Sequence, residues 1–287
     1  MSSSEFNKWS LVIKPKQKWL DINLREVWAY KDLIFIFVKR DLVSMNKQTI
    51  LGPLWFFLAP LFTVFTYTFV FSGIAQISTD GIPAPLFYLA GTTLWGYFQA
   101  CFMATTSTFT ANASLFGKVY FPRLVTPIAT VISSLLKFFI QLGLFFCLWG
   151  YYFYKGNIQP NSFAFLLPIL ILLLAGISLG MGIIISSLTT KYRDLTYFIS
   201  FGITLLMYVT PVIYPLSIIK EKYAFAYHVL EYNPISPIIE AFRKGFMGKG
   251  CFESMYELGY SFSFMLLVLF VGIILFNKTE RTFMDTV

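Results

Sequence analysis

The side chains with the clearest capacity for acid–base chemistry gather in one polar stretch, residues 216–255. It contains Glu221, His228, Glu231 and Glu240, and carboxylates and imidazoles are the common general acids and bases of enzymes. Their spacing matches no catalytic constellation, and a solvated role is expected for His228, the single histidine of the sequence. The pattern favours a protein that is not an enzyme. A membrane-embedded transferase acting on lipid-linked sugars is the alternative, with these four residues as its candidates.

Motifs for binding nucleotides or metals are missing from the sequence. It contains no G-x-x-x-x-G-K-[ST] loop, whose backbone N–H groups would cradle the phosphates of ATP. The chain is therefore not expected to hydrolyse ATP itself. Its three cysteines, Cys101, Cys147 and Cys251, lack the paired spacing of a disulfide framework or a metal site. We predict no catalytic residue, no metal and no cofactor in this chain, so its energy source must lie elsewhere.

The composition indicates a membrane protein. Hydrophobic residues make up 57% of the chain, charged residues 13%, and the mean hydropathy is +0.68, far from the values of soluble domains. Apolar stretches of about 20 residues, enough to cross a hydrocarbon core of about 30 Å, recur along it. We predict an all-α integral membrane protein with a cytoplasmic N-terminal segment (1–52) and a six-span domain (53–287). The predicted spans are 53–74, 86–108, 125–154, 163–189, 197–214 and 256–276.

The distribution of cations predicts the orientation of these spans. Nine of the 22 Lys and Arg residues precede Ile50, and others follow the second, fourth and sixth predicted spans. The loop after the first span has none, and the loop after the third has only Lys155. With six spans the cation-rich segments fall on one side, which predicts that both termini are cytoplasmic. The net charge of +8 is thus a topology signal, with some attraction to anionic lipid, and does not indicate a nucleic-acid partner.

The polar stretch between the last two predicted spans has helical features of its own. Ser236-Pro237 can begin a helix, with serine at the cap and proline in the first turn. Apolar residues then share one face, opposite Arg243 and Lys244, as in a helix that lies in a membrane interface. We predict a short fifth span followed by re-entrant or interfacial helices at 216–255 that form an outer gate; an ordinary long loop is the alternative. The predicted gate residues are Pro211, Tyr214, Ile239, Phe242 and Phe246.

Two predicted cytoplasmic segments have the features of contact elements. Between residues 22 and 31, apolar and charged side chains recur on opposite sides of a helix, as in a helix that lies in the interface or against a soluble partner. Residues 112–123 form a compact bend, in which Asn112 or Ser114 can cap one short helix. The bend is either an apolar-tipped contact element or a tight turn with no partner.

Polar residues recur every three or four positions along three of the predicted spans. Such stripes either hydrogen-bond to neighbouring helices or line a wet path. Hydroxyls and aromatic rings without charge would suit a sugar chain, because rings stack on the C–H faces of sugars and hydroxyls exchange hydrogen bonds with them. The candidates for a channel lining are Thr63, Tyr67, Trp95, Gln99, Thr106, Thr204 and Tyr208.

Lys137 is the charged residue that the sequence places deepest in a predicted span. An ionisable group in a membrane is by default a candidate for function, although a lysine side chain can also reach the interface. A proton- or sodium-coupled carrier should show several buried acids, and none is evident in the interior of the spans. A secondary carrier or flippase for lipid-linked sugars is therefore an alternative that lacks its expected residues.

Four motifs, ordered along the chain, carry a resemblance to a known family. They are Arg40-Asp41-Leu42 with Lys47-Gln48-Thr49-Ile50-Leu51-Gly52-Pro53-Leu54-Trp55, then Lys118-Val119-Tyr120-Phe121-Pro122-Arg123, then Tyr192-Arg193-Asp194-Leu195, and finally Pro211-Val212-Ile213-Tyr214-Pro215 with Asn233-Pro234. Over roughly residues 24–285 the chain resembles ABC-2 type permeases that export polysaccharides, including the O-antigen, capsule and teichoic-acid exporters. It departs from the family pattern at Met45-Asn46, where relatives usually have a basic residue and a tyrosine.

The resemblance implies a homodimer of six-span subunits in the inner (cytoplasmic) membrane of a bacterium. Two copies of a separate cytoplasmic ATPase subunit would bind to it and would hold the ATP and Mg. The cargo would be a lipid-linked glycan on polyprenyl diphosphate, such as the O-antigen of a lipopolysaccharide. It would move through a channel lined largely by spans one, two and five, surrounded by membrane lipid.

The resemblance also implies which residues contact the ATPase. In such transporters the N-terminal amphipathic helix, here about residues 22–30, and the bend after span two, here about residues 112–121, make this contact. The predicted contact residues are Leu24, Arg25, Val27, Trp28, Asn112, Leu115, Phe116, Gly117, Lys118 and Tyr120.

Overall fold

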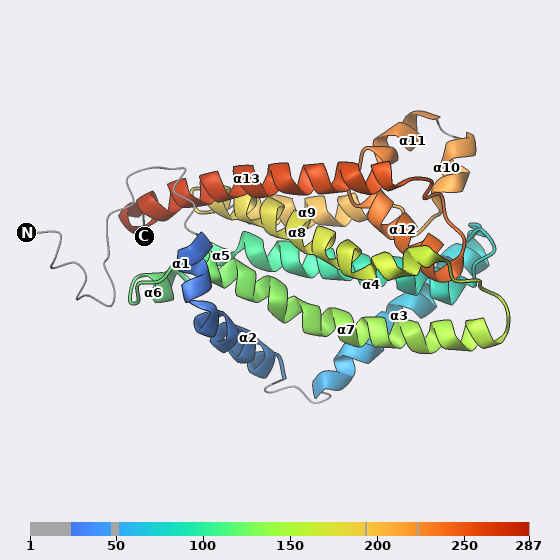
Figure 1. Ribbon diagram of the computed structural model, residues 1–287, viewed down its shortest axis with the longest axis horizontal. Coiled ribbons are helices and arrows are strands. Elements are labelled where there is room, and N and C mark those ends of the chain that lie inside the picture. Colours follow the sequence, from blue (N-terminus) through green and yellow to red (C-terminus); the bar gives the residue numbers. More distant parts are fainter. Residues whose placement is uncertain (1–23, 47–51, 193, 223, 287) are drawn as a thin grey trace, which may run out of the picture.

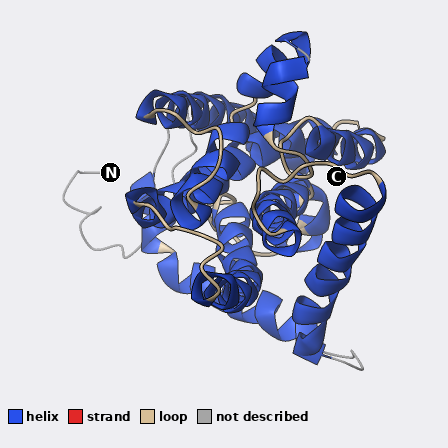
Figure 2. Ribbon diagram, turned by 90° about the vertical axis from the view of Figure 1, so that its right-hand side faces the viewer, coloured by secondary structure: helices blue, strands red, loops and turns tan. Residues whose placement is uncertain are grey.

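The computed structural model describes residues 24–46, 52–192, 194–222 and 224–286 (Figure 1). Within these ranges the chain consists of helices joined by loops and contains no strand (Figure 2), which confirms the predicted all-α class. The elements in chain order are α1 (Leu24–Ala29), α2 (Lys31–Asn46), η2 (Gly52–Leu54), α3 (Trp55–Tyr67), η3 (Thr68–Ile74), α4 (Ala84–Thr106), α5 (Thr108–Ala111), α6 (Ala113–Phe116), α7 (Val125–Tyr154), η4 (Ser162–Leu166), α8 (Leu167–Thr189), α9 (Leu195–Tyr208), α10 (Leu216–Lys222), α11 (Ala224–Glu231), α12 (Ser236–Met247) and α13 (Met255–Thr286).

Four of the six predicted spans are confirmed as helices long and apolar enough to cross a membrane. They are Trp55–Ile74, Val125–Tyr154, Ser162–Thr189 and Met255–Glu280. The first joins α3 to the π-helical η3, and the third joins η4 to α8. The other two predicted spans are also helical. α4 has 23 residues, about 34 Å, but is less apolar, and α9 has 14 residues, about 21 Å, which is shorter than a typical hydrocarbon core.

The fifth predicted span ends earlier than we predicted. The prediction was 197–214, whereas α9 ends at Tyr208 and residues 209–214 form turns. Pro211 gives the reason, because proline lacks an N–H group and pushes the preceding residue out of the helical region. The hydroxyl of Tyr214 donates to the carbonyl of Tyr208 at 2.6 Å, and this satisfies one of the carbonyls that a helix end leaves without a partner.

α4 lies inside the bundle and is enclosed by other helices. Fifteen of its 23 residues are buried, and it contacts α3, α7, α8, α9 and α12. Figure 1 shows α4 running between α7 and α8. A helix enclosed in this way meets little lipid, so hydroxyls and aromatic side chains can replace the aliphatic residues of a lipid-facing span.

Glycines allow α8 and α13 to pack closely. A methyl group added at Gly180 of α8 would stand 2.9 Å from the backbone nitrogen of Leu269. A methyl group at Gly272 of α13 would stand 2.9 Å from the carbonyl oxygen of Gly180. On the α4 side of α8, Gly182 lies against Thr105 in the same manner. These positions hold three helices at backbone contact distance, the arrangement that small residues permit in membranes.

The elements at the two ends of the bundle differ. Figure 1 shows α1, α5, α6 and the last turns of α13 together at one end, called the α6 end below, and α10, α11 and α12 at the other, called the α12 end. The α6 end has its own apolar core, here named the α6-end cluster. It consists of Val27, Ile34, Phe37, Phe109, Phe116, Phe121, Val125, Ala129, Ile183 and Phe276.

Lys137 lies within α7, a helix of 30 residues that is long enough to span a membrane, and its depth in the membrane stays a prediction. α2 packs along the first half of α7, where the hydroxyl of Ser133 lies 3.4 Å from a carboxylate oxygen of Asp41. One turn later, the ammonium of Lys137 lies 6.0 Å from the ring centre of Phe56, the second residue of α3. Lys137 is therefore level with the beginning of the first span. α7 has 30 residues, about 45 Å, and exceeds a hydrocarbon core of about 30 Å.

The α8–α13 contact generates a stability prediction. Gly180→Ala is expected to lower the free energy of unfolding by about 1–3 kcal/mol, because the added methyl group meets backbone atoms that cannot move aside. Gly143→Ala is the matched control: Gly143 also lies within a helix, and a methyl group there meets no atom within 4 Å. This control should be neutral or stabilising by about 0.5–1 kcal/mol. Thermal unfolding in detergent measures both, and equal shifts would contradict the close contact.

Candidate functional site

α12 is held inside the protein by a buried arginine. The side chain of Arg243 is 1% exposed. Its Nη1 donates to the carbonyl of Pro211 at 2.6 Å, and its Nη2 donates to the carbonyl of Val212 at 2.9 Å. Nη1 also lies 3.0 Å from Oε1 of Glu240, one turn earlier on α12, in a buried ion pair. The guanidinium stands 3.7 Å from the ring centre of Phe87 on α4, within the range of a cation–π contact.

Further groups complete the surroundings of this ion pair. The second carboxylate oxygen of Glu240 accepts the backbone N–H of Cys251 at 2.9 Å. Gly91 of α4 leaves space for the guanidinium, since a methyl group there would stand 3.0 Å from Nη2 of Arg243. Burial, with the Glu240 carboxylate nearby, raises the pKa of the Cys251 thiol to about 11, so this thiol is protonated and unreactive at neutral pH.

The buried arginine corrects part of the prediction for this region. Eleven of the twelve residues of α12 are buried, so α12 is not an interfacial helix with a cationic face toward solvent. The turns after α9 leave carbonyl groups that need donors, and Arg243 supplies them from inside the protein. Ser236 is the first residue of α12 and not its cap, which is Ile235. The Glu240–Arg243 spacing of three residues was the sequence signal for this pair.

The predicted gate residues lie on or beside α12. Pro211, Ile239, Phe242 and Phe246 are buried, and Tyr214 is half-buried. The rings of Phe242 and Phe246 pack against Phe145 of α7, at centroid distances of 5.0 and 5.8 Å. In this conformation the four buried residues are part of the core, and their role as a gate stays a prediction.

At the α6 end, the bend between α4 and α7 is fixed by aromatic packing. Phe116 is 6% exposed, and its ring lies 6.1 Å from Phe109 and 5.7 Å from Phe121. The guanidinium of Arg123 stands 5.3 Å from the centre of the Phe116 ring, and its Nη1 donates to the backbone carbonyl of Glu280 on α13 at 2.7 Å. Burial lowers the pKa of Arg123, while the Glu280 carboxylate opposes this change.

The predicted ATPase-contact residues divide into anchors and exposed groups. Val27 and Phe116 belong to the α6-end cluster and anchor α1 and the bend. Asn112 and Leu115 are half-buried, and the amide of Asn112 donates to the carbonyl of Thr108 at 2.9 Å rather than capping α6. The exposed members are Arg25, Trp28, Gly117, Lys118 and Tyr120, and the side chain of Leu24 lies outside the described residues. Trp28 is 73% exposed and stands out among them.

The predicted channel residues come from α3, α4 and α9, and the structure brings some of them together. The ring of Tyr67 on α3 lies 6.0 Å from Tyr88 on α4, and its hydroxyl lies 4.0 Å from the sulfur of Met207 on α9. Trp95 is buried, and Gln99 is half-buried. The hydroxyls of Thr63, Thr106 and Thr204 donate to carbonyls of their own helices. Tyr208 and Thr204 are exposed, whereas Thr106 is buried.

Three aromatic donors on α4 lack acceptors in this conformation. The hydroxyls of Tyr88 and Tyr97 and the indole N–H of Trp95 are buried and have no hydrogen-bond partner among the described residues. Such groups are costly when they stay unpaired. Neighbouring α3 and α9 offer mainly apolar side chains to solvent or lipid: only 6% of the first span is buried, and Tyr197, Phe198 and Phe201 of α9 are each more than 60% exposed.

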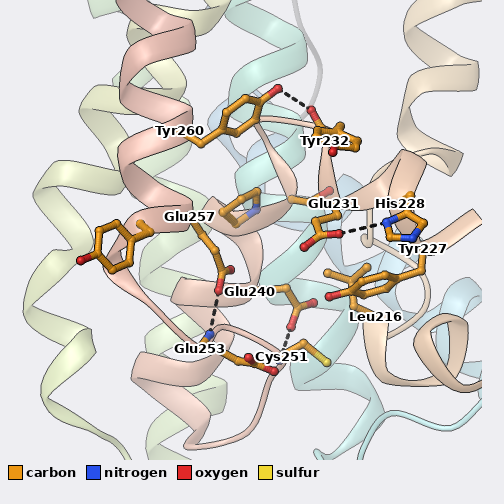
Figure 3. A pocket seen from close by; sticks show the side chains of 13 residues that line it. Leu216, Tyr227, His228, Glu231, Tyr232, Glu240, Cys251, Glu253, Glu257 and Tyr260 are labelled. Carbon is orange, nitrogen blue, oxygen red and sulfur yellow. Dashed lines mark hydrogen bonds and ion pairs between the residues drawn. The ribbon is translucent and has the colours of Figure 1, made fainter. Parts of the chain in front are cut away.

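A cavity of about 420 Å³ lies at the α12 end, between α11, α12 and α13 (Figure 3). Four tyrosines, one histidine and four glutamates contribute to its wall. His228, Glu231 and Glu240 from the sequence analysis line it, while the side chain of Glu221 is outside the described residues. Nδ1 of His228 lies 3.5 Å from Glu231, and both side chains are largely exposed. Glu240 is already occupied by Arg243, so these groups form no acid–base constellation.

These features define a class of protein. The chain is a multi-pass helical membrane protein, with one end built around an anchored bend and the other around a buried ion pair. Its residues 32–247 match the family described as ABC-2 type transporter. The chain belongs to the ABC-2 type transporter family, as the sequence motifs predicted.

Its relatives include proteins from two bacteria. The O-antigen export system permease protein RfbA of Klebsiella pneumoniae is 28% identical over 254 residues, which cover 88% of this chain and 94% of the relative. The protein of the same name from Myxococcus xanthus is 28% identical over 220 residues, which cover 77% of this chain and 82% of the relative. The similarity therefore extends over more than three quarters of each protein.

The buried ion pair generates a second prediction. Arg243→Ala is expected to destabilise the protein by about 3–5 kcal/mol, because it leaves the Glu240 carboxylate buried without its cation. Arg243→Lys should lie between this variant and the wild type, since an ammonium cannot fork to two carbonyls and a carboxylate as a guanidinium does. Thermal unfolding in detergent, with Lys244→Ala as the control one residue away, tests this. An Arg243→Ala protein as stable as the control would contradict the role of the pair.

Proposed function

We propose that the chain is the permease subunit of an ABC transporter that exports a lipid-linked polysaccharide. The cargo would be an O-antigen-like glycan on polyprenyl diphosphate, moved across the inner membrane of a bacterium. The observation that carries this proposal is the similarity to permeases named for O-antigen export, over 88% of this chain in one case and 77% in another. The polar residues of the enclosed α4 are consistent with a path for sugars.

The energy would come from two copies of a cytoplasmic ATPase subunit, which bind ATP and Mg. The α6 end is suited to contact them, because Trp28, Lys118 and Tyr120 are exposed there. The neighbouring Val27 and Phe116 belong to the α6-end cluster and hold these exposed residues in place. A displacement of the bend would be transmitted directly to α13, because the rings of Phe109 and Phe276 lie 4.5 Å apart and Arg123 donates a hydrogen bond to the α13 backbone. In this orientation both termini are cytoplasmic.

The working unit would be a homodimer of six-span subunits, with α4 and α9 as the spans additional to the four long apolar helices. The open faces of α3 and α9 support this arrangement, since the first span is the least buried of the four long apolar helices. A second copy placed against these faces would enclose a path next to α4. Tyr67, Gln99 and Tyr208 would line this path, and separation of α3 and α9 from α4 would open Tyr88 and Trp95 to it.

The charges of the described core argue against a secondary carrier. Among the described residues, Glu240 is the carboxylate that is buried, and it is paired with Arg243 at 3.0 Å. A coupling acid must exchange a proton or a cation during transport, whereas this carboxylate is held by a permanent cation. The alternative of ion-coupled transport thus lacks the group on which it would depend.

The proposed ATPase contact predicts the effect of one substitution. Trp28→Ala should weaken co-purification with the ATPase subunit by about tenfold, because large aromatic side chains dominate the energy of many interfaces. Phe35→Ala is the control, since Phe35 on α2 is similarly exposed, at 69% compared with 73% for Trp28, but was not predicted to touch the ATPase. Equal retention of the ATPase by both variants would contradict a contact through α1.

The proposed cargo is tested by deleting the gene and measuring the glycan on both sides of the membrane. We expect loss of surface polysaccharide together with accumulation of lipid-linked glycan on the cytoplasmic side, and the accumulated glycan identifies the cargo. A plasmid-borne wild-type copy should restore export. Normal surface glycan without accumulation, in a strain with no redundant exporter, would refute polysaccharide export and favour a smaller lipid or drug substrate.

A further inference from the structure

The cavity between α11, α12 and α13 has a wall of mixed character. Its volume of about 420 Å³ falls within the range of small-ligand pockets, roughly 300–1,000 Å³. In Figure 3 the carboxylates of Glu231 and Glu240 and the hydroxyl of Tyr227 point into the same space. Tyrosine rings offer flat apolar surfaces, and carboxylates accept hydrogen bonds from hydroxyls. A wall that combines both suits a ligand with C–H faces and several hydroxyl groups.

The hydroxyl of Ser236 is a polar group of a cavity-lining residue that no other described group of the protein satisfies. Ser236 lines the cavity and is 1% exposed. Its Oγ has no hydrogen-bond partner among the described residues, although buried polar groups nearly always have one. A ligand hydroxyl would satisfy it once the side chain rotates toward the cavity, because the Oγ atom itself is covered in this conformation. The backbone around Ser236 is well fixed, because the Oδ1 of Asn233 accepts the N–H of Ile235 and the hydroxyl of Ser261 donates to the carbonyl of Pro234.

The charge of the wall restricts the kind of ligand. Two of the four glutamates form ion pairs with basic side chains at 3.0 and 3.1 Å. The other two, Glu231 and Glu257, have no lysine or arginine partner among the described residues, although Nδ1 of His228 lies 3.5 Å from Glu231 and Glu257 accepts the backbone N–H groups of Glu253 and Ser254. The wall therefore has an excess of carboxylates. These carboxylates would repel a phosphate or an acidic sugar bound in the cavity, whereas they would not repel a neutral sugar. No group of three metal-ligand side chains that could hold an ion occurs in the described part of the chain.

We infer that this cavity binds a neutral saccharide unit of the transported glycan at the α12 end. The inference rests on the proposed function for the source of the sugar, and it adds a second contact with the glycan outside the α3–α4–α9 path. Tyr256, which lines the cavity and is 89% exposed, would stack on one face of the sugar. Ser236 would exchange hydrogen bonds with its hydroxyls, and the carboxylates of Glu231 and Glu257 would accept hydrogen bonds from them.

The site is tested on the purified full chain in detergent, without the ATPase. Saturation-transfer difference NMR with methyl α-mannoside, methyl β-galactoside and methyl N-acetyl-β-glucosaminide should give signals with millimolar dissociation constants, corresponding to about 4 kcal/mol. Methyl β-glucuronide, measured at the same concentration, should bind at least about fivefold more weakly because of its carboxylate.

Two variants separate a ligand contact from a structural role. Ser236→Ala should weaken binding about fivefold without lowering the thermal stability, because the hydroxyl has no partner in the free protein. Tyr256→Ala should weaken binding by a similar factor through loss of the ring. Tyr154→Ala is the matched control: this tyrosine ends α7 at the same end of the bundle, is 93% exposed and does not line the cavity.

The possible results show whether the cavity is a site for neutral saccharides, and they separate failure of this inference from failure of the proposed function. No signal from any neutral glycoside at about 10 mM, or signals that survive both cavity variants, would overturn the inference. Equal binding of the glucuronide would overturn the assignment to neutral sugars. If the gene deletion blocks export and the ATPase co-purifies while no glycoside binds, only this inference fails. If glycosides bind at the cavity but the deletion leaves export intact, the proposed function fails and the saccharide site stands as a property of the chain.

Discussion

The position of α12 depends on a positive charge kept inside the protein. A guanidinium removed from water needs partners for its donors and its charge. The two Nη groups of Arg243 find them in three places, Glu240 on α12, the turn after α9 and the ring of Phe87 on α4, whereas its Nε has no partner among the described residues. Movement of α12 away from the turn after α9 would leave buried N–H groups of Arg243 without their carbonyl acceptors, although the ion pair within α12 would stay intact. α12 is therefore a fixed part of the bundle, whereas α10 and α11 contact mainly each other.

The two ends of the molecule are connected through long helices. At the α6 end an apolar cluster joins α1, α2, the bend and the end of α13. At the α12 end the indole of Trp149 on α7 donates to the carbonyl of Phe246 on α12 at 2.7 Å, and Ser261 of α13 donates to the loop before α12. α7 and α13 thus contact both ends and connect the bend to the surroundings of the buried ion pair.

The sequence predicted what depends on local pattern and missed what depends on distant partners. The limits of α7, residues 125–154, were predicted to the residue because a long apolar run between polar loops is a local signal. The burial of Arg243 was not, since its carbonyl partners lie 31 and 32 residues earlier and amphipathic spacing alone assigns a cation to the outer face. The approach of Lys137 to Phe56 of α3 was not predicted either, because these two residues lie far apart in the sequence. The predicted role of Trp28 rests on family resemblance and that of Tyr208 on the polar stripe of its predicted span, as exposure in a single chain does not identify a partner.

The close fit of α8 and α13 also constrains how the chain is made. A ribosome releases the N-terminal segments first, so α8 enters the membrane while its partner helix is still being synthesised. Until then the backbone around Gly180, which Leu269 later covers, faces lipid without close packing. α13 also closes the bend, through Arg123 and Phe276. The chain therefore reaches its final packing only when the last helix is complete. A chain truncated before α13 leaves the face of α8 around Gly180 uncovered in the membrane.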